Sequence, residues 1–87
     1  MLEKPLVLEV GQIVAGPTAG LILVDLGFNV IKIEQPGRGD VARHFTGPSK
    51  GNFAFFNRGK RSITLNLKMR EGREAFIKLA RRADVVI

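Results

Sequence analysis

The sequence contains no cysteine, no tryptophan and no tyrosine. Without cysteine the chain cannot form a disulfide bond or a zinc–thiolate site, which agrees with a cytoplasmic location. No apolar run approaches the ~20 residues that a membrane-spanning helix needs, so we predict no membrane insertion. The first five residues also lack the basic and apolar regions of a secretory signal. These absences argue against a membrane protein and against a secreted disulfide scaffold.

Positive charge, by contrast, is in excess. Lysine and arginine number 14 against 8 aspartates and glutamates, which gives a net charge of +6 in a chain of 87 residues. Such a charge favours an anionic partner: nucleic acid, acidic lipid or a phosphate-bearing cofactor. The basic residues cluster in 58–61 and 70–82. A nucleic-acid-binding module is therefore one alternative, although no recognised nucleic-acid motif accompanies the charge.

The first third of the chain has the pattern of a strand, a helix and a second strand. Residues 6–10 form a short apolar run between a proline and a glycine, which predicts a buried strand. Pro17 suits the first position of a helix, and Gly27 suits a left-handed C-terminal cap. Apolar residues cover nearly all faces of this helix, so we expect it to be buried between layers. A second strand over 29–34 completes a parallel βαβ unit.

The rest of the chain divides into a long loop and a second βαβ-like unit. Residues 35–61 contain several glycines and prolines and four phenylalanines that need burial. They predict a loop with one short helical or extended stretch, and a loop of this length is more often functional than idle. A third strand over 62–66, an amphipathic helix over 72–83 and a fourth strand from 84 follow. Because the chain ends inside that last apolar run, we expect a fragment of an α/β fold.

The turn after the first predicted strand has the glycine spacing of a phosphate-binding loop. Gly11 and Gly16 fit G-x-x-x-x-G-K-[ST], but Pro17 replaces the lysine and removes one backbone N–H, which disfavours nucleotide hydrolysis. Glu34 stands where a dinucleotide-binding fold holds a ribose hydroxyl, yet G-x-G-x-x-G is absent. An NAD-binding enzyme is thus a further alternative. Close packing of strand, turn and helix is the simpler explanation for the glycines, above all for Gly20.

Three further polar features precede the third strand. Residues 37–40, Gly-Arg-Gly-Asp, place a flexible backbone and a cation beyond the carboxyl end of a strand, where ligands bind in open α/β sheets. The alternative is that these four residues form a solvated turn with no ligand. His44 is the only histidine, so we predict no metal site. The run 58–61 is interpreted as a solvated basic turn or as a phosphate clamp for a cofactor.

Short motifs also occur in a fixed order along essentially the whole chain. From the N-terminus they are Val7–Val10, Ala15–Pro17, Asp25–Gly27, Val30–Glu34, Gly39, Asp40, Arg43, Asn57, Lys60–Ser62, Leu65, Lys68, Glu71–Arg73 and Ala83–Val85. In order and spacing they resemble the start of family III CoA transferases (CaiB/BaiF type), a family that also contains the α-methylacyl-CoA racemases. Each motif is weak alone, but their ordered combination is specific.

The resemblance implies a Rossmann-like α/β fold and an interlocked homodimer. Residues 1–87 would be the N-terminal, CoA-binding part of the large domain. The implied partners are a CoA thioester and a carboxylic acid, with no nucleic acid and no membrane. Val14 and Ala15 would lie beside the thioester end of CoA. Formyl-CoA transferases carry glutamine where Val14 stands, which argues against that branch of the family.

Four further residues would lie near the nucleotide end of CoA if the resemblance holds: Gln35, Arg38, Leu65 and Lys68. A lysine and an arginine complement the phosphates, and a leucine can pack on the adenine. Several family members carry arginine where Gln35 stands, so this chain lacks one cationic phosphate contact there.

Catalysis in the family uses an aspartate nucleophile that forms anhydride and thioester intermediates. The resemblance places that aspartate beyond Ile87, and neither Asp25, Asp40 nor Asp84 matches it. We therefore predict no catalytic residue here and expect the chain to be inactive alone. The predicted function is the N-terminal portion of an enzyme that transfers CoA between carboxylic acids. A fragment of an α-methylacyl-CoA racemase is the nearest alternative, disfavoured by the Ala-Gly-Pro turn and by the length of the loop before the third strand.

Overall fold

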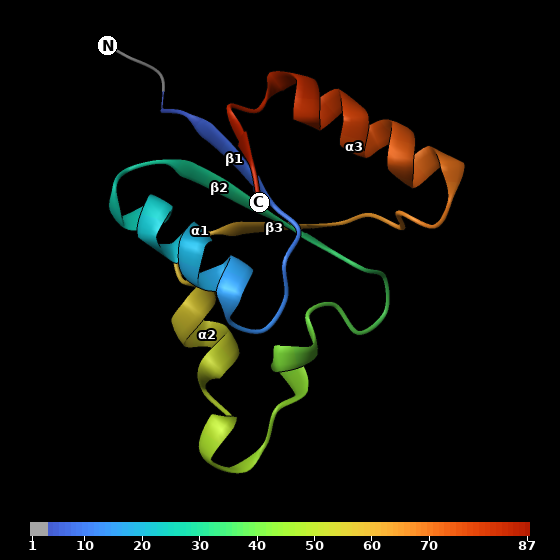
Figure 1. Ribbon diagram of the computed structural model, residues 1–87. Coiled ribbons are helices and arrows are strands. Elements are labelled where there is room, and N and C mark those ends of the chain that lie inside the picture. The colour runs from blue at the N-terminus through green and yellow to red at the C-terminus, as the bar shows by residue number, and fades with distance from the viewer. Residues whose placement is uncertain (1–3) are drawn as a thin grey trace.

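A computed structural model describes residues 4–87 (Figure 1). Strands and helices alternate along the chain, with three short helical segments between the second and third strands. In order they are β1 (Leu6–Glu9), α1 (Ala15–Asp25), β2 (Asn29–Glu34), the 3₁₀ helices η1 (Val41–His44) and η2 (Gly47–Ser49), α2 (Asn52–Asn57), β3 (Arg61–Thr64), α3 (Arg70–Arg82) and β4 (Val85–Val86).

The four strands form one parallel sheet in the order β3-β2-β1-β4. Leu6 pairs with Asn29, Ile31 with Arg61, and the short β4 joins at Val7. This order, 3-2-1-4, is that of the first four strands of a Rossmann fold. The predicted α/β class with a parallel sheet is therefore confirmed.

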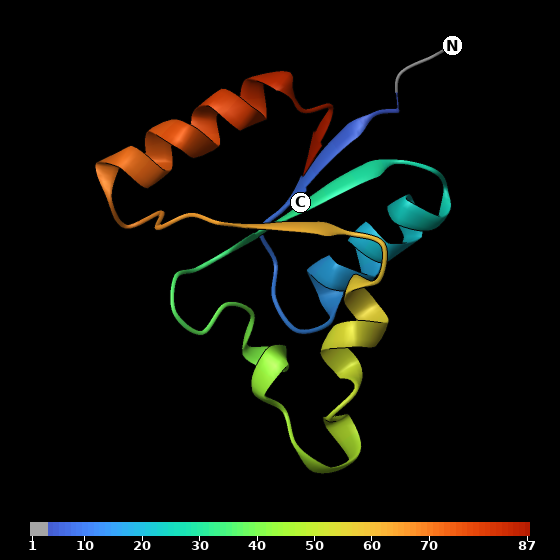
Figure 2. The ribbon, with the colours of Figure 1, turned by 180° about the vertical axis from the view of Figure 1, so that it is seen from behind.

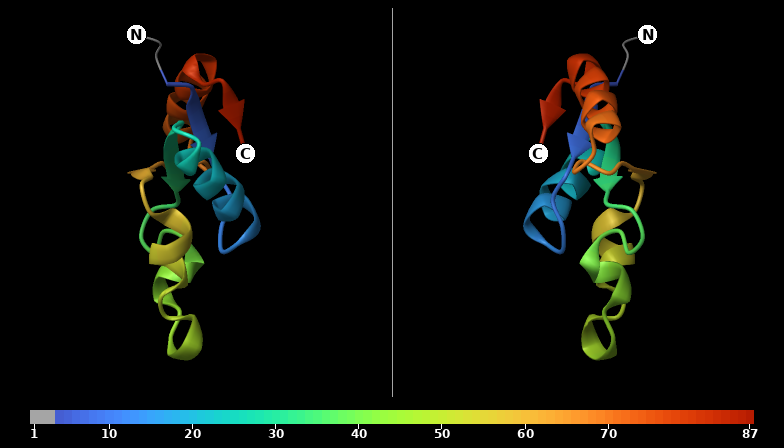
Figure 3. Two further views of the ribbon diagram at one scale, coloured as in Figure 1. Left: turned by 90° about the vertical axis from the view of Figure 1, so that its left-hand side faces the viewer. Right: turned by 90° about the vertical axis from the view of Figure 1, so that its right-hand side faces the viewer.

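Right-handed crossovers decide which face of the sheet each helix covers. The chain moves from β1 to β2 to β3 in one direction across the sheet, and then crosses back to β4. The connections through α1 and α2 therefore lie on one face, and the connection through α3 lies on the other. Figures 1 and 2 show α1 and α2 side by side and α3 apart from them. In the edge-on views of Figure 3 the segment from η1 to α2 projects from one end of the molecule.

Helix α1 differs from the sequence-based expectation in its start and in its burial. It begins at Ala15, two residues before Pro17. At its other end Gly27 has φ +93° and donates to Val24, while Phe28 donates to Leu23, so the predicted left-handed cap is a Schellman motif. Only the face toward the sheet is buried, whereas two large apolar side chains on the outer face are exposed: Ile22 at 55% and Leu26 at 67%. The expectation of burial between layers was wrong, because no element of the described chain covers that outer face.

The core lies where α1 packs on β1 and β2. Val7, Leu21 and Val30 are buried there, whereas Leu8 and Ile33, whose side chains alternate with these along their strands, are buried on the opposite face of the sheet. The closest approach in this layer occurs at Gly20, where an added Cβ would overlap the Glu9 carboxylate. The close-packing explanation for this glycine is therefore confirmed.

The long connection 35–61 holds more helix than the sequence predicts. One short stretch was expected near the phenylalanines, and the structure contains η1, η2 and α2. Not all of the phenylalanines are buried, since Phe55 is 61% exposed and touches Phe56 edge-on. Phe53 instead packs under the Arg43 guanidinium, 3.9 Å from the ring centroid. None of the residues of α3 is buried. No helix among residues 4–87 is long and apolar enough to cross a membrane.

Candidate functional site

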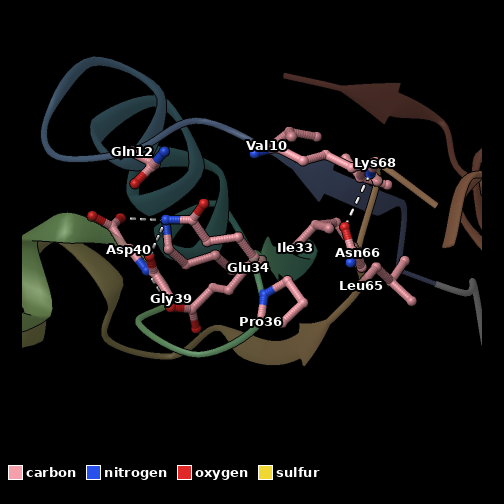
Figure 4. A pocket seen from close by; sticks show the side chains of 13 residues that line it. Val10, Gln12, Ile33, Glu34, Pro36, Gly39, Asp40, Leu65, Asn66 and Lys68 are labelled. Carbon is pink, nitrogen blue, oxygen red and sulfur yellow. Dashed lines mark hydrogen bonds and ion pairs between the residues drawn. The ribbon is translucent and has the colours of Figure 1, made fainter.

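A pocket of about 390 Å³ opens at the carboxyl edge of the sheet (Figure 4). Its walls come from the segments that follow three neighbouring strands, β1, β2 and β3. Parallel strands deliver their carboxyl ends to the same edge, which is why these distant segments meet. The lining residues are Val10, Gln12, Lys32, Ile33, Glu34, Gln35, Pro36, Gly39, Asp40, Leu65, Asn66, Leu67 and Lys68.

Three of the six residues predicted to bind CoA line this pocket: Gln35, Leu65 and Lys68. The Gln35 side-chain amide donates to the Gly39 carbonyl at 3.1 Å, and Lys68 is exposed on the opposite wall. A second hollow of about 280 Å³ adjoins it and is lined by Arg38 and again by Gln35. Four predicted residues therefore lie around two adjoining hollows.

The other two predicted residues, Val14 and Ala15, lie outside both hollows, at the start of α1. Val14 occupies the N-cap position without a side-chain cap, and no acidic residue stands in the first turn. The first backbone N–H groups of a helix have no partner within the helix. This turn therefore presents N–H groups that its own side chains do not satisfy.

Beneath the pocket lies a buried cluster of charges that the sequence analysis did not identify. The Lys32 ammonium, whose side chain is 2% exposed, lies 2.8 Å from both the Glu9 and the Asp40 carboxylates. Lys60 reaches the second oxygen of Glu9 and donates to Asn57 at 2.9 Å. Two cations thus face two anions, and each charge has partners at hydrogen-bond distance. Buried charges are tolerated only under that condition.

The pKa values in this cluster depend on burial and on pairing. Burial favours the neutral form of Asp40, but the ion pair with Lys32 and the N–H groups of Ala42 and Ile13 outweigh it and lower the pKa of Asp40 below its ordinary value. Burial lowers the pKa of Lys60, against the opposing hydrogen bond to Glu9. A signal for this cluster does exist in the sequence: Glu9 and Lys32 are charged residues inside strands that are otherwise apolar, as buried parallel strands require.

Glu34, at the end of β2, is also fully engaged. Its carboxylate accepts two hydrogen bonds from the Arg43 guanidinium at 2.7 Å, one from the Asp40 N–H at 2.8 Å and one from the Ser62 hydroxyl. These donors, Arg43 first, lower the pKa of Glu34 to about 2 although burial opposes them. A ribose hydroxyl would have to displace a partner of this carboxylate, so the NAD-binding alternative loses its key residue.

The basic run 58–61 is not a continuous solvated turn. Arg58 forms an exposed ion pair with Asp25 at 2.8 Å, whereas the ammonium of Lys60 is buried against Glu9. The interpretation made from the sequence was therefore wrong for Lys60, because the glycine before it, with φ +77°, turns the chain so that the lysine points inward. His44 contacts the Arg38 carbonyl at 2.9 Å through its ring nitrogen.

A parallel sheet in this strand order, with a pocket at its carboxyl edge, defines a Rossmann-like α/β unit. Comparison with known families identifies it further. The chain belongs to CoA-transferase family III, which it matches over residues 2–87. The resemblance seen in the sequence is thereby confirmed.

Two relatives illustrate the similarity. The succinyl-CoA:mesaconate CoA-transferase of Haloarcula marismortui is 45% identical over 99% of this chain and 24% of its own length. The acetyl-CoA:oxalate CoA-transferase of Acetobacter aceti is 46% identical over 93% of this chain and 22% of its own length. The chain therefore spans about a quarter of the length of these relatives.

Solved structures agree with the sequence comparison. The hypothetical protein Rv3272 of Mycobacterium tuberculosis superimposes with a TM-score of 0.88 at 46% identity, covering 98% of this chain and 24% of that protein. A CaiB/BaiF family protein from Brucella suis gives a TM-score of 0.87 at 43% identity, covering 94% and 24%. The matched part is the N-terminal region of such structures.

Proposed function

We propose that this chain is the CoA-binding part of an enzyme that transfers CoA between carboxylic acids. The observation that supports it best is the pocket at the carboxyl edge of the sheet, where Gln35, Leu65 and Lys68 come together from two separate segments. The relatives named above are CoA-transferases whose names pair an acyl-CoA with a dicarboxylic acid. The enzyme would act as a homodimer, as the resemblance implies, and in the cytoplasm, with which the absence of cysteine agrees.

The pocket suits the nucleotide end of CoA in chemistry as well as in place. Lys68 offers an exposed ammonium to a phosphate, and Arg38 offers a guanidinium from the adjoining hollow. Leu65 and Pro36 supply apolar surface for the adenine ring. The thioester end of the same ligand would extend toward Val14 at the start of α1, where unpaired N–H groups can face a carbonyl oxygen.

The catalytic nucleophile, we propose, comes from outside these residues. Asp25 is paired with Arg58 on the surface, and Asp40 is buried against Lys32. Asp84 accepts the Leu6 N–H at 2.8 Å. None of the three lies free beside the pocket to attack a thioester. Residues 1–87 alone should therefore show no CoA-transferase turnover above a blank, and turnover by the purified chain would contradict this.

Lys68 provides the direct test of CoA binding in the full-length enzyme. If Lys68 holds a phosphate, Lys68→Ala should weaken CoA binding by about 1–3 kcal/mol, the size of a charge-assisted contact. The loss should shrink for dephospho-CoA if the contact is to the 3′-phosphate. Calorimetric titration with both ligands measures this. Lys78→Ala, an exposed lysine on α3 away from the pocket, is the matched control and should leave the affinity unchanged.

The same titration separates this proposal from the nucleic-acid alternative. A random duplex oligonucleotide should bind more weakly than CoA, since Arg58 is engaged in an exposed ion pair and Lys60 in a buried one. A nucleic-acid module would instead bind the duplex more tightly, with affinity that falls steeply as salt is added. Unchanged CoA affinity in Lys68→Ala would remove that lysine from the site. Racemisation of an α-methylacyl-CoA by the full-length enzyme, without CoA transfer, would favour the racemase alternative.

A further inference from the structure

The turn between β1 and α1 contains one strained residue, Ile13, whose conformation is not explained by burial of its side chain. Ile13 has φ +70°, and it is the only residue other than glycine with positive φ among residues 4–87. A β-branched side chain in this region is a true outlier. Its side chain is 39% exposed, so burial in the core does not enforce the conformation. Backbone strain of this kind persists only where neighbouring contacts impose it.

The contact that imposes it is the Asp40 carboxylate. The Ile13 N–H points at both oxygens of this carboxylate, at 3.2 and 3.3 Å. One of these oxygens also accepts the Ala42 N–H at 2.9 Å, and the other lies 2.8 Å from the Lys32 ammonium. Asp40 is itself fixed, because its own N–H donates to Glu34 at 2.8 Å. The carboxylate is therefore a rigid acceptor toward which Ile13 must turn.

Two further contacts from the same direction hold the two residues before Ile13. Lys32 donates to the Gly11 carbonyl at 3.0 Å, and the Val41 N–H donates to the Gln12 side-chain oxygen at 3.1 Å. The turn leads directly into α1, which begins at Ala15. The end of β2 and the loop after it thus fix the backbone of the segment that starts the helix.

We propose that Asp40 is a positioning residue for CoA: through the Ile13 N–H it sets the turn so that the backbone at Val14 and Ala15 meets the thioester end of the ligand. This inference rests on the proposed function. It links the two parts of the predicted binding site, because the loop that carries Asp40 also forms a wall of the pocket for the nucleotide end. Asp40 thereby connects the pocket wall at the nucleotide end of CoA to the backbone at the thioester end.

The role requires a carboxylate, not merely a polar side chain. Asp40 uses one oxygen for the Ala42 N–H, the other for Lys32, and both for Ile13. Asparagine has a single acceptor oxygen, and its NH₂ group would face either the ammonium or the backbone N–H groups, which are all donors. Asp40→Asn therefore keeps the size of the side chain but removes the acceptor either for Lys32 or for the backbone N–H groups.

A double-mutant cycle in the full-length enzyme tests positioning against a general structural role. The variants are Asp40→Asn, Ile13→Gly and the two combined, with calorimetric affinity for CoA and KM and kcat for an acyl-CoA as readouts. Glycine adopts positive φ without a steric penalty, so position 13 no longer needs Asp40 to hold it there. We expect Asp40→Asn to lower kcat/KM about tenfold in the wild-type background and about threefold or less in the Ile13→Gly background. Asp25→Ala, which breaks an exposed ion pair far from the turn, should leave the CoA affinity, KM and kcat unchanged.

The outcomes separate this inference from the proposed function. Equal losses in the two backgrounds would show that Asp40 acts only through overall stability and would overturn the inference, even if CoA binds and Lys68→Ala weakens it. The inference is supported if Asp40→Asn lowers kcat/KM less in the Ile13→Gly background than in the wild type. The thermal unfolding temperature should then fall by the same amount in both backgrounds. Should Asp40→Asn fail to fold, Gln12→Ala replaces it in the cycle, since it removes an exposed contact of the same turn without unpairing a buried charge. A wild-type enzyme that does not bind CoA would refute both proposals together.

Discussion

The carboxyl edge of the sheet and the side formed by α3 and β4 are built in opposite ways. At the carboxyl edge Glu9, Lys32 and Asp40 are buried, and each finds its ionic partner within the chain. On the other side no residue of α3 is buried, and both residues of β4 are exposed. The first region is thus defined by specific pairs between distant segments, and the second by its own hydrogen bonds and a few contacts to β1.

This contrast shows where the tertiary structure of the chain is specified. Removing one member of a buried ion pair leaves the other charge without a partner, which costs far more than the pair itself contributes. An exposed residue on α3 or β4 has water as an alternative partner. Substitutions should therefore lower stability strongly at the carboxyl edge and only slightly on the other side, and three measurements test this difference.

The largest effect is expected at Lys32. Lys32→Met keeps the length of the side chain but leaves two carboxylates buried without their shared cation, so the free energy of unfolding should fall by about 3–5 kcal/mol. Urea denaturation of the full-length protein measures it. Lys78→Met on α3 is the control and should change stability by no more than about 0.5 kcal/mol. Similar losses in the two variants would refute the contrast.

A change in stability of intermediate size is expected when acid protonates Glu34. Arg43 and the other donors lower the pKa of Glu34 to about 2 in the folded protein, from an ordinary value of 4.5. The unfolded chain therefore takes up the proton first as pH falls. The resulting stabilisation, about 3 kcal/mol, is present above pH 4.5 and is lost as pH falls through about 2.

The comparison of wild type with Glu34→Gln isolates this contribution. At pH 7 the variant should be less stable by about that amount, and the difference should shrink steadily between pH 4.5 and 2. Unfolding curves at several pH values in this window provide the measurement. A difference that does not depend on pH would mean that the Glu34 charge contributes nothing through its partners.

The smallest effect on stability is expected at β4, where self-association should change instead. Val86 is 51% exposed on an edge strand, and such strands template pairing with other chains. The chain of residues 1–87 should therefore self-associate, and Val86→Lys should reduce this while it changes stability by at most about 0.5 kcal/mol. Sedimentation velocity over a concentration series measures the association. Ile77→Lys on α3 is the control, and an equal reduction there would place the contact on the helix instead of the strand edge.

Local patterns predicted the elements with good accuracy. The apolar runs indicated β1 and β2, and Gly27 indicated the cap of α1, because short-range sterics and hydrophobic periodicity decide such features. The residues predicted to bind CoA came from a resemblance, and their role stays a prediction. The charged cluster was missed, since the partner of Lys32 lies 23 residues away at Glu9, a separation that no periodicity encodes.

The α/β class, the family and the approximate limits of the four strands and of α1 and α3 could be predicted from the sequence. These follow from side-chain periodicity, turn chemistry and the order of motifs along the chain. Three features could be seen only in the folded chain: Lys60 points inward, Glu34 is fully engaged and Asp40 holds Ile13 in a strained conformation. The physical reason is that charge pairing and strain depend on which segments the parallel sheet brings to one edge, and that is a property of the whole fold.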